Sequence, residues 1–318
     1  MSYTIPIGPY HPALEEPIHA RLTVDGERIT DAEVFVGYNH RGIERLAQER
    51  NFIQTLVLVE RVCGICSHSH SLTYALCIEH IAGMEVPKRG QYIRVIIEEL
   101  ERIHSHLLWL GIACHIVGHD SLFMQCWNDR EGTMDVLEAL TGNRVNYGMN
   151  IIGGARRDFT DDQRRDLMAA MDDLEQRMGP ITHWLTHDKT LAMRTKGVGI
   201  LTREDAIRLG AVGPHARASG VDMDVRRDAP YSSTRISTSR SPSRSPVTCT
   251  PGWSSGCWRS TRASRSSARR WTICLRAPST WAIAFPRCPR ESSSPATRHP
   301  GAIWCTRWSP TAASITTG

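Results

Sequence analysis

The chain has 318 residues, among them 38 Lys and Arg, 33 Asp and Glu, and 10 Cys. This length suffices for one large domain or two ordinary ones with a substantial core. No apolar run approaches the roughly 20 residues that a membrane-spanning helix needs, which excludes an integral membrane protein. The first residues lack the basic-then-apolar pattern of a secretory signal, so we expect a cytoplasmic protein with reduced thiols.

The formal charge of +5 hides two unlike parts of the chain. Residues 231–318 hold 13 Arg, no Lys, one acid and 19 Ser, a net charge of +12. Residues 1–230 carry a net charge of −7, which excludes a basic, nucleic-acid-binding character for the chain as a whole. We therefore divide the chain into a folded domain, 1–230, and a tail, 231–318, that is irregular or disordered.

Two interpretations of the tail remain open. It could be an Arg/Ser-rich arm that binds RNA or phosphate, or that recruits partners to a non-catalytic scaffold subunit. Alternatively, a mixture of Arg, Ser, Pro, Trp and Cys is what a GC-rich gene encodes when it is read out of frame. Ser232–Ser239 can be encoded so that a shift of two bases gives Leu-Tyr-Glu-Asp-Phe-Asp-Phe, in keeping with the preceding sequence. We favour the shifted frame.

The pattern of residues 18–36 predicts a β-hairpin near the N-terminus. Apolar and polar residues alternate over 18–24, Asp25-Gly26 is a hairpin turn signal, and the alternation resumes over 34–36.

Apolar residues at three- and four-residue steps over 92–116 predict a long, largely buried helix. We expect Glu98, Glu101 and Arg102 on its wetter face, with Arg102 paired to Glu98 or Glu99 one turn earlier.

A second helix is predicted to open with a capping box at Thr160–Gln163 and to end at Gly179-Pro180. Its apolar stripe runs over residues 167–178. Together these elements predict an α+β fold, mostly α, with a long helical-bundle core and a small N-terminal antiparallel sheet.

The segment that most suggests chemistry holds two cysteines three positions apart, Cys63 and Cys66. Such thiols can bind one soft metal ion or close a redox disulfide, and Arg61 should favour the thiolate form. The absence of a preceding strand argues against a thioredoxin-type motif. A zinc site would need further ligands such as His68 and His70, although four donors within eight residues close a tetrahedron poorly. Spacing alone leaves metal binding, redox chemistry and inert cysteines open.

The remaining cysteines and histidines of the domain have less specific surroundings. We expect core packing for three cysteines among apolar residues: Cys77, Cys114 and Cys126. Four histidines on or near the long helix are interpreted as surface or interface groups rather than ligands: His104, His106, His115 and His119.

Six segments carry a family resemblance. They are, in order, Gly8–Pro12, Gly37–Gly42, Arg61–His70, Glu99–His106, Gly142–Tyr147 and Gly213–Gly220. Together they resemble the large subunit of nickel–iron hydrogenases, specifically the energy-converting, membrane-associated branch related to the quinone-side catalytic subunit of respiratory complex I.

The resemblance implies a nickel–iron centre that splits H₂ heterolytically or forms it, with electrons leaving through an iron–sulfur cluster in a partner subunit. It implies that Cys63 is a terminal nickel ligand and that Cys66 bridges nickel and iron. His70 would donate a hydrogen bond towards the bridging sulfur. Glu16, or its neighbour Glu15, would relay the proton; we prefer Glu16.

The same resemblance implies partners: an iron–sulfur small subunit and the membrane-arm subunits of an ion-translocating complex, attached to the inner face of the cell membrane. Its substrates would be H₂ and protons, with no nucleic acid. The alternative is a metal-free protein like the quinone-side subunit of NADH–quinone oxidoreductase (complex I), in which His11 would face the quinone. That relative has a quinone-binding tyrosine where this chain has Gly64, which favours the hydrogenase.

One feature of the hydrogenase family is missing. The family completes its metal site with Asp-Pro-Cys-x-x-Cys near its C-terminus, and no Cys-x-x-Cys follows Cys66 in the sequence. Two thiolates cannot hold a metal pair that normally uses four, so we expect the chain as translated to be inactive. With this segment replaced, we also expect residues 1–230 to be marginally stable or aggregation-prone.

Overall fold

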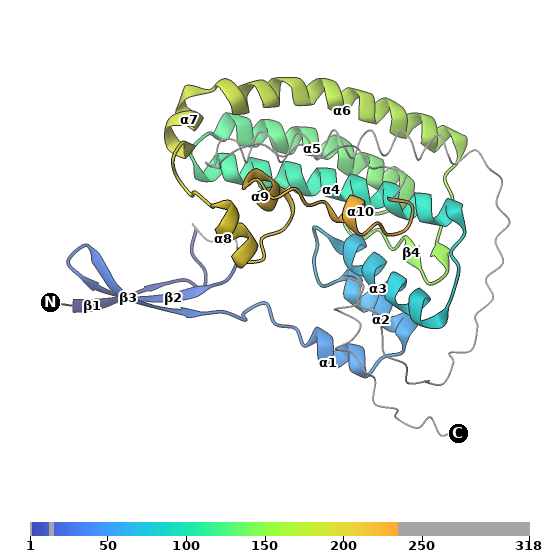
Figure 1. Ribbon diagram of the computed structural model, residues 1–318, viewed down its shortest axis with the longest axis horizontal. Helices are drawn as coiled ribbons and strands as arrows, with labels where there is room; N and C mark the ends of the chain where they lie inside the picture. The colour runs from blue at the N-terminus through green and yellow to red at the C-terminus, as the bar shows by residue number, and fades with distance from the viewer. Residues whose placement is uncertain (1, 13–15, 235–318) are drawn as a thin grey trace. The chain divides into compact units, whose positions relative to one another are not determined.

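The structure, a computed structural model, describes residues 2–12 and 16–234 (Figure 1). It divides into two compact units, Met1–Asn51 and Phe52–Gly318, and each is described by itself. The predictions made for the tail fall, from residue 235 onwards, outside the described residues.

The N-terminal unit contains a three-stranded antiparallel sheet in the order β1-β2-β3. Strands β2 (His19–Asp25) and β3 (Arg28–Phe35) form the predicted hairpin, which is confirmed. Strand β1 (Ser2–Ile7) pairs with β2 and was not predicted: Tyr3, Ile5 and Ile7 alternate along it, but the run is short and contains Pro6, which argues against a strand. The short helix α1 (Ile43–Gln48) follows the sheet in sequence.

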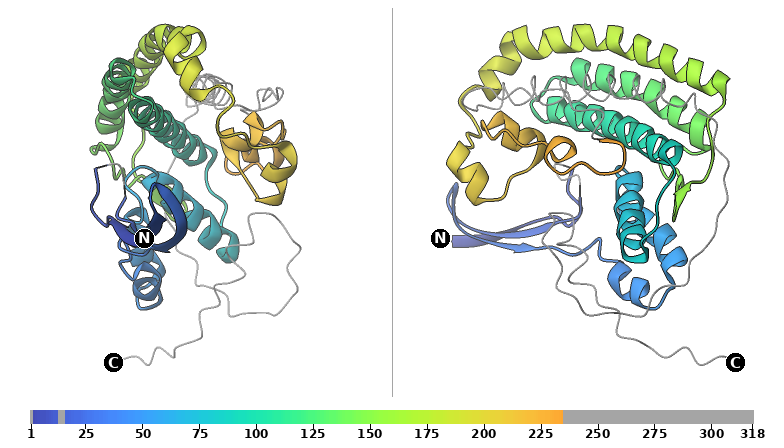
Figure 2. Two further views of the ribbon diagram at one scale, coloured as in Figure 1. Left: turned by 90° about the vertical axis from the view of Figure 1, so that its left-hand side faces the viewer. Right: turned by 45° about the vertical axis from the view of Figure 1, so that its right-hand side comes forward.

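The second unit is built on helices. Its longer helices are α2 (Phe52–Glu60), α3 (Ser67–Ala82), α4 (Lys88–Ile116), α5 (Asp120–Thr141) and α6 (Asp161–His187). Helix α4 packs on α5 and α5 on α6, so the three long helices lie side by side (Figure 1, Figure 2). The predicted long helix is confirmed and begins four residues earlier than its apolar pattern, directly after Pro87.

Short elements complete this unit. They are β4 (Asn150–Ile151), β5 (Gly154–Ala155), α7 (Lys189–Thr195), α8 (Arg203–Arg208), α9 (Gly213–Ala218) and α10 (Val225–Asp228). The predicted fold class, mostly α with a small antiparallel sheet at the N-terminus, is confirmed. In the part of the chain that the structure describes, no helix combines the length and the apolar character needed to cross a membrane.

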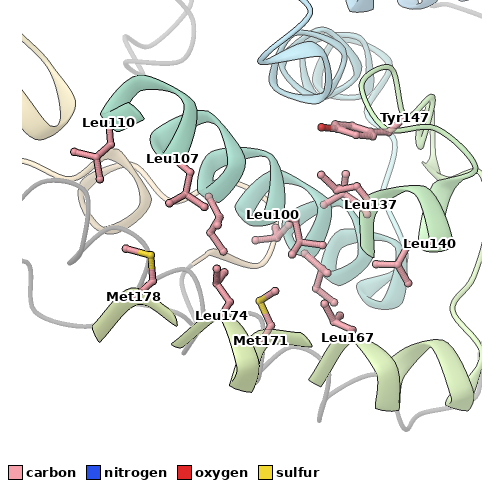
Figure 3. Close-up of a cluster of buried hydrophobic side chains, with 14 of the residues drawn as sticks. Leu100, Leu107, Leu110, Leu137, Leu140, Tyr147, Leu167, Met171, Leu174 and Met178 are labelled. Carbon is pink, nitrogen blue, oxygen red and sulfur yellow. The ribbon is translucent and has the colours of Figure 1, made fainter. Parts of the chain in front are cut away.

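The core of the second unit lies between the three long helices (Figure 3). Leucines of α4 and α5 and an apolar stripe of α6 point toward one another and bury their side chains: Leu100, Leu107, Leu110, Leu137, Leu140, Leu167, Met171, Leu174 and Met178. Cys114 and Cys126 lie within this core, as predicted, while Cys77 is only partly buried. Burying each large apolar side chain contributes about 1.5–3 kcal/mol, so this layer is the main source of stability.

Helix α6 confirms the predicted start and corrects the predicted end. Thr160 and Gln163 form the capping box. The helix does not stop at Gly179-Pro180 but continues to His187. The prediction was wrong because Ile181 and Leu185 extend the buried stripe by two more turns, and their burial outweighs the one backbone hydrogen bond that proline removes.

Replacing Pro180 by alanine should therefore stabilise the protein. The substitution restores an N–H donor on an exposed part of the helix and removes the ring, with an expected increase of about 1–3 kcal/mol in the free energy of unfolding. Urea-induced unfolding measures it. Gly179→Ala is the matched control: a Cβ there meets nothing within 4 Å, so it should add only about 0.5–1 kcal/mol. A Pro180→Ala variant no more stable than the parent would contradict this account.

Candidate functional site

The two cysteines lie in the short loop between α2 and α3. Cys66 is the N-cap residue of α3, and its thiol is hydrogen-bonded to that of Cys63. The backbone N–H of Ile65 donates to Sγ of Cys63 at 3.3 Å. Both thiols are free and partly buried. The loop thus brings the two sulfur atoms together, as the spacing predicts.

The segment before β4 holds this loop in place. The Glu60 carboxylate at the end of α2 accepts the Gly148 N–H at 2.5 Å. The Ser67 hydroxyl, at the start of α3, donates to the Val145 carbonyl at 2.6 Å. Gly64 lies next to Val145 of this segment: a Cβ added at Gly64 would be 3.7 Å from the Val145 side chain, an ordinary van der Waals contact. The cysteine loop is therefore anchored at both of its ends.

A carboxylate from α4 caps the first turn of α3. Glu101 accepts the backbone N–H groups of His68 at 2.7 Å and Ser69 at 3.0 Å. The N-cap residue Cys66 provides no side-chain cap of its own. Because Glu101 takes up these amides and the positive end of the helix dipole, little of that field is left to stabilise a thiolate at Cys66.

The electrostatic surroundings keep the Cys66 thiol protonated. Burial raises the pKa of Cys66 to about 12, and the hydrogen bond with Cys63 and the charges of Glu101 and Glu98 act in the same direction. The prediction that Arg61 favours the thiolate is wrong for Cys66, because the exposed guanidinium pairs with Glu60 at 3.2 Å. A bound cation would have to displace the thiol protons.

The donor set only half fits a nickel–iron centre. Among residues 2–12 and 16–234, no group of three or more His, Cys, Asp or Glu side chains could hold a metal ion. His68, a zinc-ligand candidate, is excluded because its ring nitrogens contact the Arg94 carbonyl at 2.9 Å and the Asn150 amide at 3.3 Å. The described residues offer two thiols, Cys63 and Cys66, where the family uses four, so no reaction step through the metal follows from them.

The other predicted site residues are distributed over both units. His70 lies on the first turn of α3; its N–H donates to the Cys66 carbonyl at 3.2 Å, and burial lowers the pKa of its ring, which favours the neutral form. Glu16 belongs to the N-terminal unit and accepts a hydrogen bond from the Asn39 amide. His11 is an exposed residue of the same unit, and Glu15 lies outside the described residues.

Comparison with known proteins gives two complementary family matches. The family described as nickel-dependent hydrogenase matches residues 41–112, which include both cysteines. The family described as respiratory-chain NADH dehydrogenase, 49 Kd subunit, matches residues 117–235. The membrane-bound hydrogenase subunit alpha of Pyrococcus furiosus is 48% identical over 222 residues, which are 70% of this chain and 52% of that protein. The chain belongs to the family that unites energy-converting nickel–iron hydrogenase large subunits with the 49 Kd-type subunit of complex I.

Further relatives represent both branches of this oxidoreductase family. The carbon monoxide-induced hydrogenase of Rhodospirillum rubrum is 45% identical over 72% of this chain and 64% of its own length. A subunit of the NADH-quinone oxidoreductase of Clostridium beijerinckii is 38% identical over 72% of this chain and 62% of its own length. A chain in the structure of the membrane-bound sulfane sulfur reductase, an archaeal respiratory membrane complex, has a TM-score of 0.82 at 26% identity, covering 90% of this chain and 76% of that one. The chain spans only about half to two thirds of the two hydrogenase relatives and of the Clostridium beijerinckii protein.

A buried ionic network behind the cysteine loop was missed by the sequence analysis. Arg102 pairs with Glu98 at 2.9 Å and approaches Glu99 at 3.5 Å, so the predicted pairing is confirmed. Arg226 donates to Glu99 at 3.0 Å and to Asp224 at 2.9 Å. The face of α4 that was expected to be wetter is in fact the centre of this network. The available signal was a pair of acids, Glu98 and Glu99, directly after three apolar residues in the middle of the helix.

Two of the helix histidines are also more buried than expected. His104 is buried, and its Nε2 lies 2.8 Å from the Tyr147 hydroxyl. Burial lowers the pKa of His104 to about 3 and that of His106 to about 4. The expectation of a surface group is therefore wrong for His104, because Tyr147, from a separate segment, covers it.

His104 should make the fold sensitive to acid. In the unfolded chain its ring takes up a proton below its ordinary pKa of 6.5, whereas the folded ring stays neutral down to about 3. Its stabilising contribution is thus complete above pH 6.5 and is lost as the pH falls. Between pH 7.5 and 5 the loss is about 2 kcal/mol, which the His104→Gln variant should not show. Urea unfolding at both pH values measures it, with the exposed His183→Gln as control. An unchanged pH dependence in His104→Gln would refute this assignment.

Proposed function

We propose that the chain is the metal-binding part of the catalytic large subunit of an energy-converting nickel–iron hydrogenase. The reaction is heterolytic H₂ oxidation or its reverse, proton reduction, with electrons passed to an iron–sulfur cluster in a partner subunit. The observation that carries this proposal is the hydrogen-bonded pair of thiols, Cys63 and Cys66, at the start of α3, inside the segment that matches nickel-dependent hydrogenases.

Individual residues take the roles that the family assigns to matching positions. Cys63 and Cys66 supply two of the four sulfur ligands of the centre, which when bound provides the site of hydride chemistry. The neutral ring of His70, one turn into α3, tunes the electron density of a ligand sulfur. Glu16 carries the proton away. Its carboxylate accepts a hydrogen bond from the Asn39 amide.

We further propose that the chain as translated is inactive because its reading frame shifts near Tyr231. The match to the 49 Kd subunit family ends at residue 235, close to where the acidic, periodic sequence gives way to the Arg/Ser-rich tail. The native domain then occupies residues 1–230 and continues in another frame, which would supply the second cysteine pair. Sequencing the gene around the Tyr231 codon tests this directly.

The proposed setting is the inner face of the cell membrane. The Pyrococcus furiosus relative is named as membrane-bound, and the structural relative belongs to a respiratory membrane complex. In the described part of this chain no helix is suited to crossing a membrane. The names of these two relatives support the proposed attachment through an iron–sulfur subunit and membrane-arm subunits.

A second candidate function is supported by the complex I matches. A metal-free, quinone-reducing protein of the 49 Kd subunit type would use the segment around His11 and would need no distal cysteines. The two candidates differ in what they bind: nickel and iron in one case, a quinone analogue in the other.

The deciding experiment is H₂-dependent reduction of a dye by the frame-corrected chain assembled with its partner subunits. The hydrogenase proposal expects activity that falls at least about a thousandfold in Cys66→Ser, because removing a ligand removes the centre. Absence of H₂-dependent activity together with binding of a quinone analogue would favour the second candidate.

A further inference from the structure

One hydroxyl group stands between two buried carboxyl groups on α4. Ser69 Oγ lies 2.8 Å from Oε2 of Glu101 and 3.0 Å from each carboxyl oxygen of Glu98. Glu98 and Glu101 are 6% and 2% exposed. The hydroxyl belongs to α3, three residues after Cys66.

The hydrogen atoms available cannot satisfy this arrangement if both carboxyl groups are ionised. A serine hydroxyl has one hydrogen and can donate it to one carboxylate. The second carboxylate would then face the hydroxyl oxygen at hydrogen-bond distance with no hydrogen between them, which is repulsive in a buried site. One additional proton removes the conflict: one carboxyl donates to Ser69 Oγ, and Ser69 donates to the other.

The two guanidinium groups near the pair favour ionised carboxyls, but they are shared with other acids. On α4, Glu98 faces Arg102, and the adjacent Glu99 is paired with Arg226 from α10, which also holds Asp224.

Glu101 has less stabilisation for a negative charge than Glu98, which faces Arg102. Its partners are the hydroxyls of Ser67 and Ser69 and two backbone N–H groups, and among the ion pairs of residues 2–12 and 16–234 none involves it. The groups that interact with Glu101 or with Glu98 from other elements include the guanidinium of Arg226, the thiol of Cys66, and the hydroxyls of Tyr147 and Tyr231. Two guanidinium groups, those of Arg102 and Arg226, are therefore available to four acids: Glu98, Glu99, Glu101 and Asp224.

We propose that Glu98, Ser69 and Glu101 share one proton at neutral pH and form a proton store directly behind the cysteine loop. When the proton moves, the O–H bond of one carboxylic acid breaks as Ser69 Oγ accepts that proton. The serine O–H bond breaks at the same time as the other carboxylate accepts its hydrogen, so one proton is displaced across the pair and no charge is created. Burial raises the pKa of Glu101 to about 8 and raises that of Glu98, in agreement with this geometry.

The use of this proton in catalysis rests on the proposed function, but its presence does not. In the hydrogenase the pair would act as a positioning group that holds a proton behind Cys66, without touching substrate. The two statements can therefore be tested separately.

Infrared difference spectroscopy of the chain itself tests the proton store. The parent protein at pH 7 should show a protonated-carboxyl band that is lost as the pH is raised through about 8. Glu101→Gln and Glu98→Gln should each remove the band, because the remaining carboxyl then ionises beside a neutral neighbour. Glu138→Gln is the control: that carboxylate is exposed on α5 and paired with Arg144, outside this network, so the band should remain.

Two milder variants keep the test decisive if a Glu→Gln variant fails to fold. Ser69→Ala should shift the band by removing the bridge, and Ser69→Thr, which keeps a hydroxyl, should restore it. No band at pH 7 in the parent, a band unchanged by Ser69→Ala, or a band lost in Glu138→Gln would each overturn the proposal.

The catalytic use is read from the pH profile of H₂-dependent dye reduction by the assembled complex, whose alkaline limb should shift in Glu101→Gln. An unchanged profile would overturn that use. If the band behaves as expected and the parent complex turns over no H₂, the proton store stands and the proposed function fails. If the parent complex turns over H₂ and the chain shows no protonated-carboxyl band, the proposed function stands and the proton store fails.

Discussion

A chain that regains a second cysteine pair should hold about one nickel per polypeptide, whereas the 318-residue chain should hold almost none. In the described part of the chain, Cys63 and Cys66 offer two thiols, and no third His, Cys, Asp or Glu completes a group that could hold a metal ion. Each thiol must also lose its proton on binding, and burial raises the pKa of Cys66 to about 12. Two sulfur ligands provide too little binding energy to offset that cost; four do.

Metal analysis of the two purified proteins, produced in a host that assembles nickel–iron centres, measures this difference. In the frame-corrected chain, Cys66→Ser should abolish nickel binding. Cys77→Ser is the matched control, because Cys77 lies on the same helix outside the cysteine loop, and its loss should leave the nickel content unchanged. Equal nickel in the 318-residue and frame-corrected chains would contradict the four-sulfur interpretation.

The sequence predicted those elements whose apolar residues recur with a clear period. The hairpin over residues 19–35 and helix α4 have clear periods, and both were found. Proline is a strong local signal for a helix end, but it was overridden at Pro180 by Ile181 and Leu185, which pack in the core. Strand β1 is held by backbone pairing with β2 although it contains Pro6, a local signal against a strand that this pairing overrides.

The candidate site also contains local features that the sequence could predict and long-range contacts that it could not. The cysteine pair is a local motif and could be predicted, as could the pairing of Arg102 with Glu98 one turn away. The burial of Glu98 depends on Ser69, 29 positions away, and that of Glu99 on Arg226, 127 positions away. A periodic pattern assigns such charges to solvent, because nothing local reveals a distant partner.

Removing the Arg94 guanidinium should destabilise the protein by about 3–5 kcal/mol, more than any surface substitution. Arg94 is fully buried, and its two Nη atoms donate to the Glu79 carboxylate at 2.9 and 2.5 Å. The same guanidinium donates to the carbonyls of Gly154 at 3.0 Å and Ile151 at 2.6 Å, so it joins α3, α4 and the β4-β5 hairpin. The Glu79 carboxylate also accepts the N–H of Gly153 at 2.7 Å. In Arg94→Met, Glu79 keeps this hydrogen bond but loses the guanidinium, and it becomes a buried charge without its cation.

Urea-induced unfolding of Arg94→Met measures this loss, and two comparisons identify its cause. The double variant Arg94→Met, Glu79→Leu removes the stranded charge together with its partner and should recover a large part of the stability. Arg165→Met breaks the exposed pair with Asp162 and should cost less than about 1 kcal/mol, because water already solvates both charges. If the double variant were as unstable as Arg94→Met alone, the loss of stability would come from the two carbonyl contacts. The contribution of the buried ion pair between Arg94 and Glu79 would then be refuted.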